Sequence, residues 1–597
     1  MRKLTVFDLE TFENFFLAAF KRIEEGKLLT VSFSDRMSER NKVILDCIMR
    51  EHTLIGYNSN NFDIPILCAA VYDNWSAKDI MQIVSYIIDE NKQGWQAQQH
   101  FALSQPPWLD TIDLMMVNPS SAQKPPLKTL GARLHSRKLQ DLPLPPGTIL
   151  TDEQKVIITD YCENDLDTTI DLYHELKPRL DLREEIGAEW GELDLRSKSD
   201  AQIAEAYMRQ QFPHAKKKIP RLEEGHIIRY EPPAHIEFQT PALKRVLEII
   251  KRRHFRLDEY GKIKFPKRFT RLTKTTIGNT TYKLGIGGLH SQESCISHIA
   301  SDKVKLIDRD MSSYYPNMII NYKLYPKHLG KRFLTLYKEI VDSRLAAKKA
   351  GNKLEAESKK IVINGGFGKF GSSFSVLFSP KLLLQTTISG QLNLLMIIEA
   401  LELAGFSVVS ANTDGFVTKV PVERESEFFA IGKHFEQLMM LELDATYYRA
   451  LYSQNVNHYL AITTDGKIKQ KGCFAHSSIS KSLAGDVIVD AAIAYLTEGA
   501  DIEQTIKACK DVRRFLCDRR VTGGASWRGQ ELGKMVRWYY STNGDTIHYT
   551  ENGNKVAKTE GAVPMMQLKT CIPDDIDYPV YVNETIKLLK SANAIEE

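Results

Sequence analysis

Two strand-like segments that end in acidic residues constrain the fold and the chemistry of this chain more than any other feature. Residues 4–8 (LTVFD) bring Asp8 and Glu10 to the end of an apolar run, and residues 304–308 (VKLID) lead into Asp310. Side chains alternate along a strand, so residues i and i+2 lie on one face, where two carboxylates can meet one cation. A single D-x-E triplet is a weak signal, because about one or two occur by chance in such a chain and surface acids explain most of them. A metal site is therefore predicted only where further acids join each pair.

The length requires more than one domain. The chain has 597 residues, whereas a single hydrophobic core stops growing at about 250–300 residues. Strand-like segments at 4–8 and 53–57 alternate with helical patterns at 76–92 and 152–177, which predicts an α/β domain over about the first 190 residues. No internal repeat or low-complexity segment is found. The net charge of +4 neither favours nor excludes a nucleic-acid partner, because a basic groove can lie within a near-neutral total.

Cysteine usage and hydropathy exclude several classes of protein. The eight cysteines are scattered without a C-x-x-C pair, so zinc and iron–sulfur sites are not expected and a reducing compartment fits better than a disulfide framework. The first ten residues show no signal-peptide pattern, and no apolar stretch approaches the length of a membrane span. We expect a cytoplasmic protein that does not use a membrane.

Residues 244–274 form a basic segment. Phe255, Tyr260, Phe265 and Phe269 are interleaved with its cations. Two interpretations stay open: a solvated surface hairpin, or a surface for a phosphate backbone and unstacked bases. The cations are Lys244, Arg245, Lys251, Arg252, Arg253, Arg256, Lys262, Lys264, Lys267, Arg268, Arg271 and Lys274.

The first acidic pair has partners farther along the chain. Asp63 follows a strand in GYNSNNFDIPIL, and Asp165 stands four residues after Tyr161 in DYCENDLDTT, on one face of a predicted helix. A core tyrosine and a surface aspartate would explain the last pair equally well. In combination, FDLET, N-x-x-x-F-D and Y-x-x-x-D resemble the three motifs of the DEDD exonucleases, in the form with a tyrosine, over residues 3–180.

The exonuclease resemblance implies a reaction and its residues. Hydrolysis of a phosphodiester needs an activated water and a stabilised leaving oxyanion, which two metal ions about 4 Å apart can provide. The resemblance implies that two Mg²⁺ or Mn²⁺ ions are held by four carboxylates: Asp8, Glu10, Asp63 and Asp165. It also implies that Tyr161 orients the attacking water, and PPLKTLGARL resembles the family's Leu-Lys-x-Leu segment, which makes Lys128 an accessory residue. No cysteine is expected among the ligands of such hard cations.

The second acidic set follows the same logic. Asp310 ends a strand, with Asp308 as a rival acid on the same face, and Asp414 lies in an Asn-Thr-Asp-Gly hairpin turn, where an ordinary turn aspartate is the alternative. Between them, helical patterns at 331–350 and from about 354 carry Arg344 and Lys348 four residues apart, and then Lys360 and Asn364. Cations on two facing helices can clamp a triphosphate; a charged, exposed helix pair is the ordinary alternative. A long helix is predicted over 381–404.

Order and flanking residues together resemble the family B DNA polymerases along nearly the whole chain. DMSSYYP is similar to motif A, KIVINGGFG to motif B, and ANTDG stands in the place of motif C. The resemblance implies metal binding by Asp310, Asp414 and the Met311 carbonyl, and nucleotide binding by Arg344, Lys348, Lys360, Asn364, Phe367 and Tyr315, the last packing under the deoxyribose. KIKQKG at 467–472 and KLGIGGLHS at 283–291 resemble DNA-contacting motifs, which implicates Lys469, Lys471, Gly287 and Gly288.

Three departures from the family pattern stand out. Asn412 replaces the first aspartate of motif C, Gly415 replaces its serine, and Gly365 and Phe367 replace a serine and a tyrosine of motif B. The change at Asn412 removes one negative charge near the metals, and we expect activity to survive with an altered metal preference. The changes in motif B remove two hydroxyls, which leads us to expect altered fidelity or nucleotide affinity.

The expected fold is a multidomain α/β protein, an RNase H-like exonuclease followed by a right-hand polymerase. The predicted parts are an exonuclease domain at 1–190, a basic linker, template-contacting region and start of the palm at 191–300, a palm at 300–330 and 375–475, fingers at 331–374, and a thumb at 476–597. In the thumb, Arg537, Trp538 and Tyr539 are predicted minor-groove contacts.

The predicted function is template-directed DNA synthesis with 3′–5′ proofreading. The resemblance implies two Mg²⁺ or Mn²⁺ per active site, dNTP substrates and a primer–template DNA partner. Short intervals between the motifs leave little room for the insertions of protein-primed members, which by analogy favours a phage, viral or plasmid replicase. We expect a monomer in the cytoplasm of a bacterial host that relies on a separate primase and helicase. Two alternatives stay open: an enzyme with only the exonuclease active, which Asn412 would favour, and a non-catalytic subunit of a replication complex.

Overall fold

The chain forms two compact units in the computed structural model, which describes residues 2–215 and 219–595. Unit 1 comprises residues 1–199, 477–488 and 503–581, and unit 2 comprises residues 200–476, 489–502 and 582–597. The segment 476–597, predicted as one thumb, therefore contributes residues to both units.

Unit 1 is built on a five-stranded sheet with the order β3-β2-β1-β4-β5. β1 pairs with β2 in an antiparallel hairpin and with β4 in parallel, so the predicted strands at 4–8 and 53–57 are neighbours. The strands are β1 (Lys3–Phe12), β2 (Phe15–Arg22), β3 (Leu28–Phe33), β4 (His52–Gly56) and β5 (Thr111–Asp113). The helices are α1 (Glu39–Glu51), α2 (Asp63–Tyr72), α3 (Ala77–Ile88), α4 (Gly94–His100), α5 (Leu114–Val117), α6 (Leu127–Arg133) and α7 (Asp152–Glu189), with the 3₁₀ turn η1 (Ser121–Gln123).

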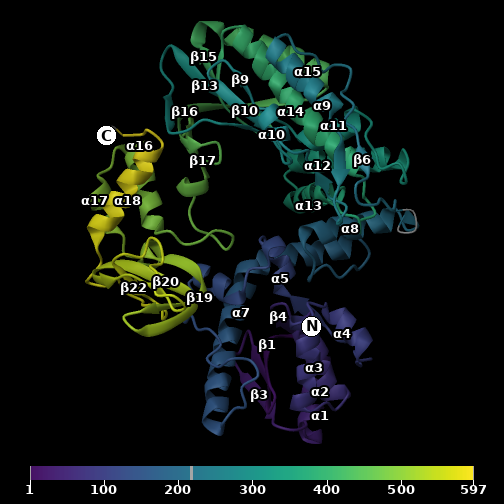
Figure 1. The fold of residues 1–597 in the computed structure, drawn as a ribbon, viewed down its shortest axis with the longest axis vertical. Helices are drawn as coiled ribbons and strands as arrows, with labels where there is room; N and C mark the ends of the chain where they lie inside the picture. Colours follow the sequence, from purple (N-terminus) through teal and green to yellow (C-terminus); the bar gives the residue numbers. More distant parts are fainter. Residues whose placement is uncertain (1, 216–218, 596–597) are drawn as a thin grey trace. The chain divides into compact units, whose positions relative to one another are not determined.

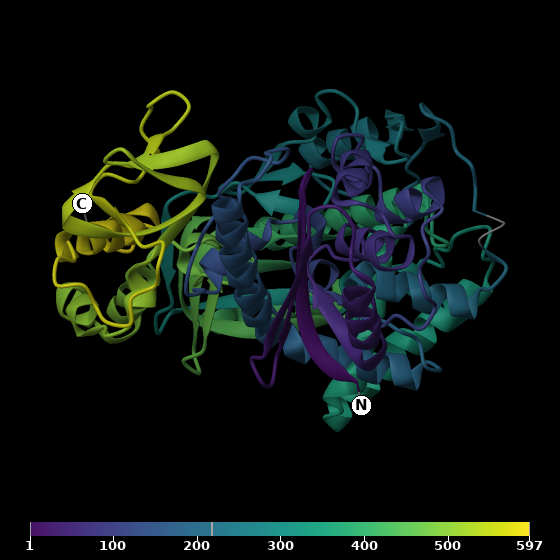
Figure 2. The ribbon, with the colours of Figure 1, turned by 90° about the horizontal axis from the view of Figure 1, so that it is seen from below.

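Alternation along β1 divides its side chains between two apolar layers. Phe7 and Leu9 pack with residues of α1, α2 and α3, whereas Val6 and Phe12 pack with the buried face of α7. Asp8 and Glu10 share the parity of Val6 and Phe12, so they lie on the face that α7 covers. Figures 1 and 2 both show α7 running alongside this sheet.

Helix α7 is longer than its sequence pattern indicates. The predicted helix ends at 177, just before Pro178, which cannot donate a backbone hydrogen bond, but the observed helix continues to Glu189. Arg183 lies in this extra segment, is 1% exposed, and donates to the carbonyl oxygens of Lys198 and Arg179 at 2.9 and 3.1 Å. Tertiary contacts therefore stabilise the helix beyond its proline.

Unit 1 contains a second sheet with the order β21-β19-β20-β22. The burial of three residues in this sheet contradicts the prediction that they contact a minor groove. Arg537, Trp538 and Tyr539 on β20 are 0%, 3% and 2% exposed, so they cannot contact a DNA groove. Burial lowers the pKa of Arg537 to about 10, and its guanidinium donates to the carbonyls of Met565 and Ser136. The elements here are α17 (Ile502–Ala508), η5 (Val512–Phe515), β19 (Cys517–Trp527), β20 (Gln530–Asp545), β21 (His548–Tyr549) and β22 (Ala562–Pro564); α16 (Asp486–Glu498) and α18 (Tyr578–Ser591) contribute residues to both units.

Unit 2 is organised around a ten-stranded sheet with β13 (Val304–Met311) near its centre. β13 is antiparallel to β15 (Gly415–Pro421) on one side and to β16 (Leu443–Asn455) on the other. The order is β18-β17-β16-β13-β15-β14-β11-β10-β9, with β12 paired to β16. The other strands are β9 (Thr275–Ile277), β10 (Thr280–Leu284), β11 (Leu289–Ser291), β12 (Ile296–Ile299), β14 (Ser407–Asn412), β17 (His458–Thr463) and β18 (Ile468–Lys471).

Helix α14 (Pro380–Leu403) forms the apolar support of this sheet. It is the one described helix long and apolar enough to cross a membrane, but 94% of its apolar window is buried within the protein, so it is a core helix. Ile307 and Met311 of β13 belong to the same core as α14, whereas Leu306 belongs to a separate cluster. Asp308 and Asp310 have the parity of Leu306 and lie on the face away from α14.

The remaining elements of unit 2 surround the sheet. The helices are α8 (Asp200–Gln211), α9 (Pro241–Arg252), α10 (Phe269–Leu272), α11 (Tyr314–Asn321), α12 (Arg332–Ala350), α13 (Lys353–Lys369) and α15 (Glu425–Met439), with the 3₁₀ turns η3 (Val422–Arg424) and η4 (Gly472–Phe474). A small sheet contains β6 (Ile227–Ile228), β7 (Phe255–Leu257) and β8 (Ile263–Lys264). The predicted helices at 331–350, from 354 and at 381–404 correspond to α12, α13 and α14 and are confirmed.

The aromatic residues of the basic segment have different surroundings. Phe255 and Phe269 are 0% and 1% exposed and pack edge-to-face with Phe265, at ring-centroid distances of 5.4 and 4.9 Å. Tyr260 is 67% exposed. Three of the four aromatics therefore pack in or against the core, and only Tyr260 among them is exposed.

Candidate active sites in the two units

The end of β13 and the β14–β15 turn bring Asp310 and Asp414 together in unit 2. Asp310 stands opposite Gly415 in the register of β13 and β15, and the Met311 amide donates to the carbonyl oxygen of Asp414 at 2.8 Å. Thr413 takes a positive φ of 56°, so the turn is tight and projects Asp414 beside the strand end. The carboxylates line one cavity of about 370 Å³, as their positions in the sequence predict.

Negative charge is crowded at this strand end. Burial, and then the neighbouring Asp308, raise the pKa of Asp310 to about 6. Burial also raises the pKa of Asp414. A third acid, Asp444, faces Asp310 from β16 and lines the adjacent pocket. Sequence reasoning missed Asp444, because it lies in a strand (LELDATYY) without a distinguishing motif.

Asp308 and Lys469 form an ion pair beneath the acidic cluster. Lys469 Nζ lies 3.0 Å from Asp308 Oδ2, 2.9 Å from the Tyr448 hydroxyl and 3.8 Å from Asp310 Oδ2, and Tyr448 donates its hydroxyl proton to Asp308. Burial alone would lower the pKa of Lys469. The nearby carboxylates of Asp308 and Asp310 have the larger combined effect and raise it. Lys469 therefore faces the acidic cluster, whereas Lys471, the other predicted DNA contact, is exposed and lines the same cavity.

A second pocket of about 460 Å³ adjoins the carboxylates. It is lined by residues of α11, α12 and α13 together with Asp414, and among the predicted nucleotide-binding residues it contains Arg344, Lys348, Asn364, Tyr315 and Phe367. Arg344 is oriented by a 3.3 Å hydrogen bond from its guanidinium to the Ser313 hydroxyl. Lys360 is not among the lining residues; its Nζ lies 3.1 Å from Glu357 on its own helix.

Tyr315 connects this pocket to a glycine-rich loop. Its ring stacks on Phe367 at a centroid distance of 4.8 Å and an angle of 19°, and its hydroxyl donates to the Gly287 carbonyl at 3.0 Å. Gly287 lies between β10 and β11, and a Cβ at Gly288 would come within 3.0 Å of Thr413 Cα. Of the two predicted template-contacting glycines, Gly288 therefore packs directly against the turn that carries Asp414, and Gly287 contacts Tyr315.

Gln391 holds the start of this loop and was not predicted from the sequence. Its side-chain oxygen accepts from the Gly285 amide and its amide nitrogen donates to the Gly285 carbonyl, both at 2.9 Å. Gln391 is fully buried in α14. A polar residue within the apolar run SGQLNLL is the only sequence signal that could have identified it.

The structure gives physical reasons for three departures from the family B motifs. The Asn412 amide donates to the Val456 carbonyl at 3.3 Å, a bond that an aspartate could not donate. A Cβ at Gly415 would lie 3.0 Å from the Arg309 carbonyl oxygen and 3.2 Å from Asp310 Cγ, with the carboxylate oxygen closer still. At Gly365 a Cβ would lie 2.5 Å from the Asp200 carbonyl oxygen, because α13 packs there against the start of α8.

Unit 1 contains the other acidic cluster. Donor atoms of Asp8, Glu10 and Cys162 lie within 4.8 Å of one another. Burial raises the pKa of Asp8 to about 6, and burial followed by the charge of Asp8 raises that of Glu10 well above its usual range. Burial also raises the pKa of the Cys162 thiol well above its usual range. The thiol was not expected in this cluster; as a neutral thiol it is a poor ligand for a hard cation.

Asp63 reaches this cluster from the first turn of α2. It is 4% exposed, and its pKa is raised first by burial and then by the charge of Asp8. Asp113 at the end of β5 accepts hydrogen bonds from the backbone amides of Asn58 and Asn60 at 2.9 and 3.2 Å. Asp113 thus fixes the loop that leads to Asp63, a positioning role that its sequence does not reveal.

The third motif faces the same cluster from α7. Asp165 and Tyr161 are 6% exposed, and Asp165 forms an ion pair with Lys128. Lys128 also lies over the Tyr161 ring at 4.3 Å, and burial lowers its pKa to about 8. Burial, followed by the charges of Glu10 and Asp8, raises the pKa of Tyr161. The residues predicted from three distant motifs are therefore gathered within one unit.

The donor sets of both clusters fit divalent hard cations. Carboxylate oxygens are the preferred ligands of Mg²⁺ and Mn²⁺, and acids with raised pKa values are sites where negative charge lacks full compensation. Asp310, Asp414 and the backbone at Met311 would hold the ions in unit 2; Asp8, Glu10, Asp63 and Asp165 would hold them in unit 1.

Comparisons with known proteins give matches among solved structures only. No family of known proteins matches this sequence, and no curated protein matches it either. Among solved structures, the chain is similar to the family B DNA polymerase from the hyperthermophilic archaeon Pyrobaculum calidifontis, with 12% sequence identity, a TM-score of 0.39, and coverage of 100% of this chain and 79% of that chain. A similarity of this size leaves the geometry of the two clusters as the basis for a functional assignment.

Proposed function

We propose that this protein is a template-directed DNA polymerase with a 3′–5′ proofreading exonuclease. The observation that carries the proposal is the placement of Asp310 and Asp414 at one strand end, between a pocket with Arg344 and Lys348 and a loop with Gly287. Carboxylates for metal ions, cations for phosphates and a flat aromatic surface are the components that nucleotidyl transfer requires.

The polymerase residues have distinct tasks. Divalent metal ions, when bound, would activate the primer 3′-hydroxyl and neutralise the pyrophosphate that leaves. Arg344 and Lys348 bind the triphosphate oxygens, and the Ser313 contact holds the Arg344 guanidinium in place. The Tyr315–Phe367 stack forms a flat wall for the sugar and the base, which excludes a 2′-hydroxyl and so selects dNTPs. Lys360 joins the triphosphate only if its contact with Glu357 opens.

The exonuclease residues complete the proposal. Tyr161 orients the attacking water through its hydroxyl, and its raised pKa keeps that hydroxyl protonated. Lys128 holds Asp165 in place and offsets the charge of the neighbouring acids. The substrate of this site is the 3′ end of a DNA strand, which a proofreading enzyme removes when it is mispaired.

The wider assignment depends on the same proposal. We infer a primer–template DNA partner, Mg²⁺ or Mn²⁺ as cofactor, a monomeric enzyme in the cytoplasm of a bacterial host, and a phage, viral or plasmid replicase that uses a separate primase and helicase. Lys471 contacts the primer–template duplex from the exposed face of β18.

Two point variants in a primer-extension assay test the proposal. With a labelled primer–template, Mg²⁺ and dNTPs, Asp414→Ala should reduce extension by at least about a hundredfold and leave 3′ degradation unchanged. Asp8→Ala should have the reverse effect, because the two clusters belong to different units. Extension that survives Asp414→Ala would refute the assignment of the polymerase site, and degradation that survives Asp8→Ala would refute that of the exonuclease.

A further inference from the structure

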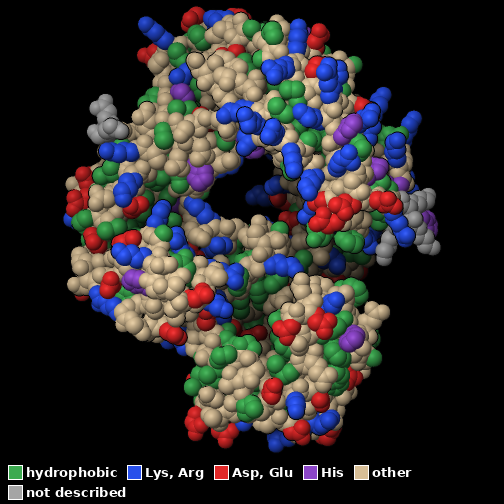
Figure 3. All heavy atoms as spheres, in the orientation of Figure 1, with side chains coloured by type: hydrophobic (Ala, Val, Ile, Leu, Met, Phe, Trp, Pro, Cys, Tyr) green, Lys and Arg blue, Asp and Glu red, His purple; other side chains and the backbone are tan. Residues whose placement is uncertain are grey.

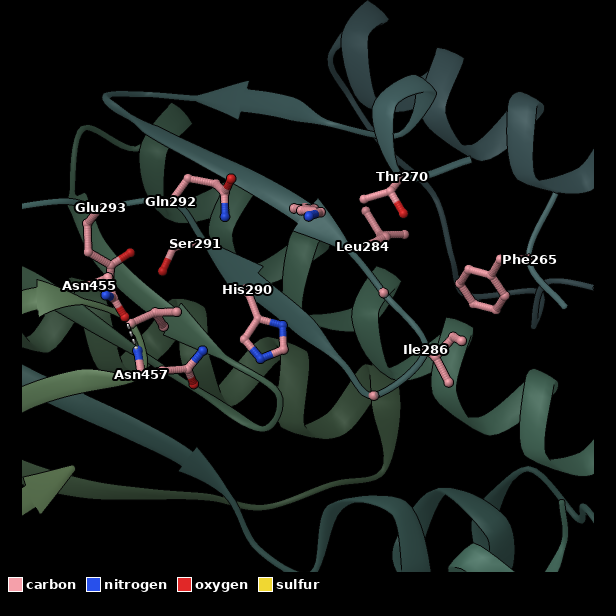
Figure 4. A pocket seen from close by; sticks show the side chains of 14 residues that line it. Phe265, Thr270, Leu284, Ile286, His290, Ser291, Gln292, Glu293, Asn455 and Asn457 are labelled. Atoms are coloured by element: carbon pink, nitrogen blue, oxygen red, sulfur yellow. Dashed lines mark hydrogen bonds between the residues drawn. The ribbon is translucent and has the colours of Figure 1, made fainter. Parts of the chain in front are cut away.

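Two cavities of unit 2 are larger than the two pockets at the acidic cluster. The first, of about 700 Å³, is drawn in Figure 4, with Phe265 at one end, Asn457 at the other and the His290 ring between them. The glycine-rich loop that Tyr315 contacts forms part of its wall, so this cavity belongs with the site proposed for synthesis. The second, of about 660 Å³, is lined by none of the residues assigned to synthesis.

Three segments that are distant in sequence form the walls of this second cavity. They are residues 220–231, which include β6, residues 323–328 between α11 and α12, and residues 378–385 at the start of α14. Most of the lining is apolar, and its volume lies in the range of about 300–1,000 Å³ that is usual for binding sites. The apolar lining includes Leu222, Ile228, Leu324, Tyr325, Phe378 and Leu382.

Hydrogen bonds hold the three walls in place. Gln385 is 8% exposed; its side-chain oxygen accepts from the Glu231 amide at 3.2 Å, and its amide group donates to the Glu231 carbonyl oxygen. His328 Nε2 donates to the Val376 carbonyl oxygen at 2.7 Å, which ties the α11–α12 connection to the α13–α14 connection. The cavity is therefore formed before a ligand binds, which lowers the entropy cost of binding.

The rim of the cavity carries more positive than negative charge. Glu231 is the one acidic side chain in the described lining, and its carboxylate lies 2.8 Å from Lys381 Nζ. This pair leaves the exposed Lys323 and Lys327 as the net charge of the lining. Figure 3 shows lysine, arginine and histidine side chains, beside one group of acidic ones, over the part of unit 2 around β6 and α12. Charge complementarity therefore favours a negatively charged partner.

An edge strand belongs to the same wall and favours a peptide as the partner. β6 ends the order β6-β7-β8 of its small sheet, so one of its edges has no partner strand among the described residues. Edge strands bind extended peptides through backbone hydrogen bonds, while side-chain pockets provide specificity. A nucleobase fits this cavity poorly, because its polar edge needs hydrogen-bond partners and the Gln385 side chain is already engaged.

We propose that this cavity docks an acidic peptide segment of a partner protein. The segment inserts a large apolar side chain between Leu222 and Phe378 and places its carboxylates against Lys323 and Lys327. Its backbone lies in extended form beside β6. Because the cavity is separate from the residues proposed for nucleotide binding, a partner held here would be recruited without entering the nucleotide pocket. The docking site does not depend on the proposed polymerase function.

Fluorescence anisotropy with three labelled peptides of equal length tests the site on the full-length protein. The first peptide alternates pairs of aspartates with leucine and phenylalanine. The second carries lysine in place of aspartate, and the third carries serine in place of leucine and phenylalanine. Only the first is expected to bind, and its affinity should fall as NaCl is raised from about 50 mM to about 500 mM, because salt screens the lysines of the rim.

Two variants locate the bound peptide. Lys327→Glu should weaken binding of the acidic peptide by about fivefold, since it replaces an attraction at the rim by a repulsion. Leu222→Glu should weaken it by about tenfold or more, because it places a carboxylate in the apolar lining. Lys331→Glu is the matched control: Lys331 is an exposed lysine four positions along the chain that does not line the cavity, and its variant should bind as wild type does.

The remaining outcomes would overturn the proposal. Wild-type protein that binds none of the three peptides, or all three equally, would exclude an acidic and apolar partner. Wild-type affinity in both Lys327→Glu and Leu222→Glu, or equal losses in Lys327→Glu and Lys331→Glu, would exclude this cavity as the docking site. Lys327 is exposed, so its variant remains informative if Leu222→Glu fails to fold. Displacement of the peptide by a single-stranded oligonucleotide whose own binding Lys327→Glu weakens would assign the surface to nucleic acid instead.

Discussion

Restoring the serine of motif C at Gly415 should damage synthesis rather than improve it. A Cβ at this position would lie 3.0 Å from the Arg309 carbonyl oxygen and 3.2 Å from Asp310 Cγ, with a carboxylate oxygen of Asp310 closer still. The backbone on both sides is fixed by the β13–β15 pairing, so the Asp310 carboxylate must move by on the order of 1 Å. A displacement of about 1 Å at a reacting centre costs about a hundredfold in rate, equivalent to about 2.7 kcal/mol of barrier.

Single-turnover kinetics measure this effect without interference from DNA release. Gly415→Ser and Gly415→Ala should both extend a primer by one nucleotide about a hundredfold more slowly than wild type, because the Cβ and not the hydroxyl causes the displacement. The excision rate of the same preparations is the internal control, since the exonuclease cluster belongs to unit 1. Extension at the wild-type rate or faster in Gly415→Ser would show that Asp310 accommodates the side chain, and would refute the reasoning.

Three further perturbations follow from contacts in the two sites and in unit 1. Asn412→Asp should slow extension by about tenfold, because it loses the hydrogen bond to the Val456 carbonyl and adds charge to the acidic cluster; steady-state kcat is the measurement, and an unchanged kcat contradicts the account. Lys128→Met should lower the unfolding free energy of the metal-free protein by about 3–5 kcal/mol, since it leaves Asp165 buried and unpaired, and should impair excision while sparing extension. Burial lowers the pKa of His135 to about 4, so the stability that depends on its neutral form is present above pH 6.5 and is lost as the pH falls from 6.5 toward 4. Asparagine tolerates the positive φ of 56° at this position, so His135→Asn should preserve the backbone. Between pH 7.5 and pH 5 the melting temperature of this variant should fall by less than that of the wild type; equal decreases would contradict this.

Apolar runs and helical patterns in the sequence predicted several regular elements of the fold. The helix expected at 381–404 is α14 (Pro380–Leu403), and the strand expected at 304–308 begins at Val304 and continues through Asp310 to Met311. These segments were predictable because local pattern and tertiary burial agree. Helix α7 was predicted too short, because packing around Arg183 outweighs the local effect of Pro178.

The sequence predicted the acidic residues of both candidate sites, but it did not predict the residues that hold them in place. The two acidic clusters were expected because carboxylates at strand ends have a chemical signature. Asp444 and Asp113 were missed, since each lies in a strand whose partner is set by sheet order, which no local pattern encodes. Arg537 was predicted to contact DNA and is buried, because its charge is compensated by backbone carbonyls that belong to segments remote in sequence.

Under the proposed function, the contacts of Tyr315 would make discrimination of the sugar and placement of the glycine loop mechanically interdependent. One aromatic side chain rests on Phe367 of α13 and holds the Gly287 carbonyl through its hydroxyl. A ribonucleotide that pushes this ring aside would therefore also release the glycine loop from its anchor. Under the proposed function, a wrong sugar would thus also loosen the loop that is implied to contact the template, and a single steric conflict would weaken the binding of both substrates.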